Sequence, residues 1–158
     1  RRRTAEFRAT KPMLMVDFWN DGPIISGCLA GGRKYIHVNA NGDIEPCVFC
    51  HFATDNIRRA SIRDALKSPL FRKIRERQGE HDNLLTPCML MDHPDVGREL
   101  FSSQGVYPTH EGAEAIFTSL AGAMDDYSRR YGEIADQAWE KEFSGTASHV
   151  KKAGNAKP

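Results

Sequence analysis

The stretch that decides the fold is CLAGGRKYIHVNANGDIEPCVFC, residues 28–50, in which cysteines enclose a predicted β-hairpin. Polar and apolar side chains alternate over residues 35–39, with the period of a half-buried strand. Asn41-Gly42 is a strong signal for a tight hairpin turn, because both residues accept a positive φ. Pro46 has no N–H group to donate, so we expect the second strand to end there.

The positions of the four cysteines predict a single metal-binding site. Cys28 precedes the first strand and Cys47 follows the second, so the hairpin returns both to the same end. Cys47 and Cys50 form a C-x2-C chelate, which directs two thiolates at one metal. Cys88 lies in a predicted loop over residues 79–93 and is expected to supply the fourth thiolate. Four thiolates suit zinc or an iron-sulfur cluster, and one short chelate with two distant cysteines favours the cluster.

An apolar run, MLMVDFW, occupies residues 13–19. Such a run is typical of a strand buried on both faces of a parallel sheet, and it needs neighbouring strands. The rest of the chain offers no similar strand, so we expect the sheet to lie in an N-terminal portion upstream. A central strand of a small mixed sheet is the alternative. Asp17, Trp19 and Asn20 come at the carboxyl end of the run, where barrel enzymes place active-site groups, and are candidate substrate-facing residues.

From residue 61 onward the pattern becomes helical. Ser61 and Asp64 resemble a capping box, and apolar residues at helical spacing follow. Ser68-Pro69 is expected to divide this region into two helices, with proline at the first helical position of the second.

The last third of the chain predicts further helices. A short helix is expected over residues 95–104. Thr109 is expected to cap a long amphipathic helix over residues 110–143, either continuous or broken at Gly122. The tail over residues 144–158 is rich in Gly, Ala, Ser and Lys and is predicted to be disordered.

Composition excludes several classes of protein. The 158 residues include 22 Lys+Arg and 21 Asp+Glu, which is ordinary for one soluble domain. No apolar run approaches the roughly 20 residues of a membrane span, and no secretory leader is visible, so we predict a cytoplasmic protein without membrane contact. The basic segment over residues 58–77 is interpreted as a solvated or interdomain face. Nucleic-acid binding is not expected, because no aromatic residues are interleaved on that face.

Residues 24–92 resemble the SPASM or twitch auxiliary domain of radical S-adenosylmethionine (SAM) enzymes. The family has a cysteine followed by Gly-x4-Cys, and Cys28-x13-Gly42-x4-Cys47 fits this pattern. The short helix ahead of Ser68-Pro69-Leu70-Phe71 is also similar to the family's sequence after the cluster. The resemblance implies an oxidoreductase-type role in electron transfer or substrate positioning for a radical reaction, with one [4Fe-4S] cluster ligated by Cys28, Cys47, Cys50 and Cys88.

Two departures limit what the resemblance implies. A full SPASM domain has a further C-x2-C-x5-C-x3-C series and holds two clusters, whereas four cysteines allow one. The chain also lacks the C-x3-C-x2-C motif that binds the SAM-cleaving cluster in the family. SAM and a second [4Fe-4S] cluster are therefore expected only in an N-terminal radical SAM barrel of the same polypeptide, the expected partner. This chain is expected to be inactive alone, and a peptide is a candidate substrate.

Together these features predict an α+β fold. A short β-hairpin with a cysteine-ligated cluster is followed by a mostly helical C-terminal region, and the N-terminal strand belongs to a partial (β/α) barrel. The expected divisions are the barrel end over 1–25, the cluster-binding domain over 26–92, the helical extension over 93–143 and the tail over 144–158. The alternative function is a zinc-stapled, non-catalytic protein-interaction module.

Overall fold

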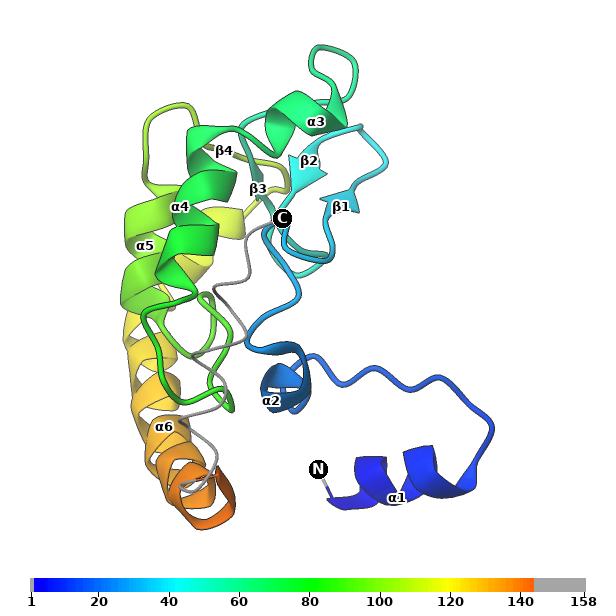
Figure 1. The fold of residues 1–158 in the computed structure, drawn as a ribbon. Coiled ribbons are helices and arrows are strands. Elements are labelled where there is room, and N and C mark those ends of the chain that lie inside the picture. The colour runs from blue at the N-terminus through cyan, green and yellow to red at the C-terminus, as the bar shows by residue number, and fades with distance from the viewer. Residues whose placement is uncertain (1, 144–158) are drawn as a thin grey trace.

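The chain combines short antiparallel strands with helices, so the predicted α+β class is confirmed (Figure 1). The structure is a computed structural model that describes residues 2–143, and the predicted tail over 144–158 lies outside the described residues. The strands are β1 (His37–Val38), β2 (Ile44–Glu45), β3 (Phe52–Ala53) and β4 (Tyr107–Pro108). The helices are α1 (Arg2–Thr10), α2 (Gly22–Ile25), α3 (Ile62–Ala65), α4 (Pro69–Arg77), α5 (Pro94–Phe101), the 3-10 helix η1 (Ala113–Phe117) and α6 (Ala121–Phe143).

The predicted hairpin is present as the antiparallel pair β1 and β2, in which Val38 lies opposite Ile44. The strand β2 ends at Glu45, directly before Pro46, as the missing N–H group of proline requires. Ile44 is fully buried, so this short ladder is anchored by its packing as well as by its hydrogen bonds.

The hairpin turn differs from the predicted Asn-Gly turn. Gly42 has a positive φ of 87°, but Asn41 does not. The Asn39 side-chain oxygen instead accepts hydrogen bonds from the N–H groups of Asn41 and Asp43, at 2.9 and 3.0 Å. A side chain that satisfies two backbone donors of its own turn removes the need for a second residue with positive φ.

The helices α3 and α4 begin at the capping residues that the sequence predicts. Ser61 accepts a hydrogen bond from the N–H group of Asp64, and Ser68 accepts one from Phe71. Pro69 is the first residue of α4, so the chain breaks between two helices where the sequence predicts it. Phe71 is fully buried on the inner face of α4, which packs against α5.

A second antiparallel pair, β3 with β4, has no counterpart in the sequence predictions. Phe52 lies opposite Pro108, and the next residue, Thr109, donates its N–H group to the carbonyl oxygen of His51 at 2.9 Å. The prediction that Thr109 caps a long helix is therefore wrong, because its backbone extends the pairing with the β3 segment. The chain forms η1 first and begins α6 only at Ala121, so the break precedes Gly122, which lies inside α6.

The strand expected over residues 13–19 is not formed. Leu14 is 92% exposed and no strand is assigned in this segment, because none of the described residues pairs with its backbone. Arg8 holds the segment instead, donating to the carbonyl oxygen of Met15 and to both carboxylate oxygens of Asp21, the latter at 2.7 Å. Figure 1 shows α1 at the far end of this irregular segment. Within residues 2–143, no helix has the length and apolar character needed to span a membrane.

Candidate metal centre

All four cysteines lie on the wall of one cavity of about 310 Å³. Cys28 comes from the loop before β1, Cys47 and Cys50 follow β2, and Cys88 comes from the loop between α4 and α5, as predicted. All four are free thiols. The rest of the wall is largely apolar and includes Trp19, Phe49, Ile74, Met89, Leu90, Phe101 and Met124.

The hairpin brings Cys28 and Cys47 to the same end, as the sequence predicts. The N–H group of Gly31 donates to the carbonyl oxygen of Pro46 at 3.0 Å. This bond joins the segment before β1 to the segment after β2. Each sulfur also accepts a hydrogen bond at 3.4 Å from the backbone N–H group two residues later in the chain. Such bonds favour the thiolate form and tune the potential of a bound cluster.

A tight turn presents Cys88 from the other side of the cavity. The backbone N–H group of Cys88 donates to the Asp92 carboxylate at 2.9 Å, and the N–H group of Asp92 donates to the Cys88 carbonyl oxygen at 2.8 Å. Asp92 is only 5% exposed, and its burial raises the pKa of its carboxyl group to about 6. The turn is therefore fixed by a buried acidic side chain that sequence patterns do not single out.

The four thiols lie close enough to affect one another electrostatically. Burial is the main cause that raises the pKa of each, to about 12 for Cys88 and well above the usual value for Cys50. A smaller electrostatic contribution connects Cys28 with Cys47, Cys47 with Cys50, Cys50 with Cys88 and Cys88 with Cys28. The metal-free thiols therefore stay protonated at neutral pH, and a bound metal must displace their protons.

The space that the four thiols line is larger than a closed zinc site needs. A zinc ion with sulfurs at about 2.3 Å needs those sulfurs about 3.8 Å apart. Among residues 2–143, no group of three or more His, Cys, Asp or Glu side chains is arranged to hold a single ion. The thiols instead surround a space much larger than one ion.

Of the three candidate substrate-facing residues, only Trp19 reaches this cavity. Its ring packs against Phe49, with centroids 5.6 Å apart. Asp17 and Asn20 do not line the cavity. They form a local turn instead, in which the Asn20 backbone N–H and side-chain amide donate to the Asp17 carboxylate at 3.1 and 2.9 Å.

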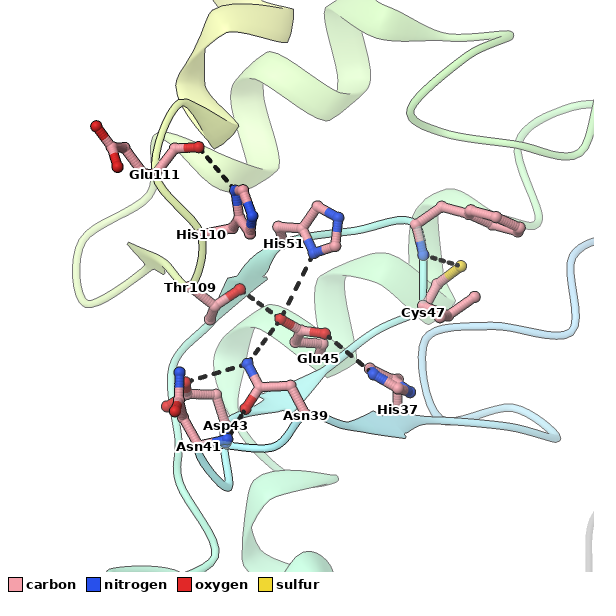
Figure 2. Close-up of polar contacts among 12 residues, drawn as sticks. His37, Asn39, Asn41, Asp43, Glu45, Cys47, His51, Thr109, His110 and Glu111 are labelled. Atoms are coloured by element: carbon pink, nitrogen blue, oxygen red, sulfur yellow. Dashed lines mark hydrogen bonds and ion pairs between the residues drawn. The ribbon is translucent and has the colours of Figure 1, made fainter.

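A buried carboxylate beside the metal centre is the main feature that sequence reasoning missed (Figure 2). Glu45 is 1% exposed, and its Oε1 accepts hydrogen bonds from Asn39 at 3.1 Å and from the Thr109 hydroxyl. His37 Nε2 lies 3.8 Å from Oε2, and His51 Nδ1 lies 3.9 Å from Oε1. Alternating polar residues in a hairpin give no signal for this arrangement, because the decisive donor comes from Thr109.

Free thiols around one apolar cavity, carried by a hairpin and a tight turn, are a ligand set that suits a metal centre. Comparison with family models agrees with this kind of site, since residues 28–92 match the SPASM iron-sulfur cluster-binding domain. Over these residues the chain is similar to the SPASM family, which is typical of radical SAM enzymes, and the resemblance seen in the sequence is confirmed there. Searches of curated proteins and of solved structures gave no significant match.

Proposed function

We propose that this chain is the auxiliary cluster-binding portion of a radical SAM enzyme, with one [4Fe-4S] cluster ligated by Cys28, Cys47, Cys50 and Cys88. The observation that carries the proposal is that the SPASM segment places all four free thiols around one cavity. The cavity that they line, about 310 Å³, is much larger than a single ion, which supports a polynuclear cluster over one zinc ion.

The protein residues around the cavity fit such a cofactor. When bound, an iron-sulfur cluster supplies one-electron transfer, and the protein sets its position and potential. Apolar side chains such as Met89, Leu90 and Phe101 keep water away from the thiolates, and backbone N–H groups stabilise the sulfurs of Cys28 and Cys47. Full ligation by four thiolates would leave no iron position open to substrate.

The role that follows is electron transfer to or from a substrate radical, or maintenance of the substrate pocket. The partner is a radical SAM barrel in the same polypeptide, which would hold SAM and a second [4Fe-4S] cluster, and a peptide is the candidate substrate. Trp19 and Phe49 are the side chains best placed to meet that partner or substrate. Both line the cavity, and Phe49 is 52% exposed, so this part of the wall reaches the surface.

Anaerobic reconstitution with iron and sulfide tests the proposal. The expected product is a brown protein with broad charge-transfer absorption in the visible range and a ratio of iron to sulfide near one. Cys88→Ala should lower the iron content and change the electron paramagnetic resonance spectrum of the reduced protein. Unchanged iron content in Cys88→Ala would show that Cys88 is not a ligand.

The alternative function is a zinc-stapled interaction module. The observation that favours it is the exposure of apolar side chains on the C-terminal helical region, with Ile134 67% exposed and Leu120 49% exposed. A colourless protein that retains one zinc ion per chain through purification would support this module and refute the cluster.

A further inference from the structure

Helix α6 is joined to the loop that carries Cys88 by three side-chain hydrogen bonds. The Ser128 hydroxyl donates to the carbonyl oxygen of Asp92, and the Tyr131 hydroxyl donates to that of Leu85 at 3.1 Å. The third bond runs from the Asn83 side-chain amide to the carboxylate of Asp136, at 2.7 Å.

These contacts come from one face of the helix. Ser128 and Tyr131 are three residues apart, which is the spacing of neighbours along a helix surface. Ala135 continues this face four residues further on and is the buried residue of α6, at 3% exposure. The loop therefore rests against a stripe of α6 that supplies donors to its backbone.

The bond from Ser128 leads directly to Cys88. Its acceptor, Asp92, is the residue whose carboxylate and backbone N–H group both bond to the backbone of Cys88. Asp92 is buried, and hydrogen bonds away from water are stronger than exposed ones. Displacing this acceptor therefore changes the turn that presents the Cys88 sulfur to the cavity.

We propose that α6 positions Cys88 as the fourth cluster ligand, with Ser128 and Tyr131 as positioning residues. This inference rests on the proposed function. It places part of the cluster-holding apparatus outside the SPASM segment, which ends at residue 92. Without α6, the irregular loop between α4 and α5 would have to lose more conformational freedom each time its thiolate binds iron.

The chain offers a matched control for the test. Tyr127 lies on the same helix, stacks on Tyr131 with ring centroids 5.9 Å apart, and its hydroxyl makes no hydrogen bond to the residues described. Tyr131→Phe and Tyr127→Phe thus remove the same hydroxyl group, but only Tyr131→Phe removes a hydrogen bond to the loop.

The measurement is the rate at which the reconstituted full chain releases iron to a chelator under anaerobic conditions. Tyr131→Phe and Ser128→Ala should each release iron about fivefold faster than wild type, the effect of losing one hydrogen bond. Tyr127→Phe should match wild type. Equal rates for Tyr131→Phe and Tyr127→Phe would overturn the inference.

Two further measurements separate positioning from general destabilisation. In a Cys88→Ala background, Tyr131→Phe should cause no additional acceleration, whereas a general loss of stability would act there too. In the metal-free chain, hydrogen exchange over residues 83–92 should be faster in Tyr131→Phe than in Tyr127→Phe, and equal exchange would refute the contact. A wild-type chain that takes up no cluster would refute the proposed function, and the exchange comparison would still decide whether α6 holds the loop.

Discussion

Replacing Glu45 with alanine should destabilise the chain strongly, because its carboxylate connects the hairpin to the segment after β4. The substitution removes the acceptor of Asn39 and Thr109 at a site that is 1% exposed. Each hydrogen bond to a charged group contributes about 1.5–3 kcal/mol, so the loss of two predicts about 3–6 kcal/mol. Glu45→Gln keeps the shape and one acceptor oxygen, and should cost about 1–2 kcal/mol.

Urea unfolding of the reconstituted chain, followed by circular dichroism and cluster absorbance, gives these free energies. Glu111→Ala is the control, since this exposed acidic residue lies in the same segment and should stay within about 0.5 kcal/mol of wild type. Thr109→Val should cost about 1.5–3 kcal/mol by itself. In combination with Glu45→Ala it should add much less, because both changes remove the same bond.

Two results would refute this reasoning. Glu45→Ala within about 1 kcal/mol of wild type would show that the carboxylate is dispensable. Strict additivity of Glu45→Ala and Thr109→Val would show that the two residues do not depend on each other, whatever the size of the single effects.

Three other changes test the core, the turn and the N-terminal segment. Phe71→Ala should cost about 3–5 kcal/mol in urea unfolding, since the ring is fully buried, and a loss under about 1 kcal/mol would contradict that burial. Gly42→Ala should destabilise more than Gly105→Ala: both have positive φ, but only at Gly42 would the new methyl come within 2.9 Å of a side-chain atom. Equal losses would mean that backbone strain alone matters. The hydrogen bond from Arg8 is the main cause that lowers the pKa of Asp21. The ion pair therefore stabilises the N-terminal segment fully at pH values above the ordinary carboxyl pKa of about 4. This stabilisation is lost as the pH falls through the lowered pKa of Asp21. Asp21→Asn should therefore speed hydrogen exchange of α1 at pH 7 and have little effect at a pH below the lowered pKa of Asp21, and an equal effect at both would exclude the ion pair as the cause.

The parts of the fold that follow from nearby residues could be predicted from the sequence. Pro46 ends β2 because it lacks a donor, and Ser61 and Ser68 cap their helices with their own hydroxyls. The convergence of Cys28 and Cys47 also follows from the geometry of a hairpin. In each case the cause and the effect lie within a few residues, or on two strands joined by one short turn.

The parts that depend on distant partners could not be predicted. Nothing near Phe52 in the sequence indicates its pairing with Pro108, and Glu45 in an isolated hairpin would be expected to face water. Residues 13–19 have the composition of a buried strand, but a strand needs another backbone beside it, and no described residue provides one. The composition of residues 13–19 therefore indicates a segment suited to a strand, but it does not indicate which strand would lie beside it.

The bond between Glu45 and Thr109 also has a consequence for biosynthesis. The two residues are 64 positions apart, and at about 5–20 residues per second the ribosome needs roughly 3–13 s to make the intervening chain. Cys28, Cys47 and Cys50 are synthesised early, while Cys88, Thr109 and Ser128 follow in that order. A nascent chain thus presents three thiols before either the last one or its supports exist, so under the proposed function stable loading of a cluster would follow translation of α6.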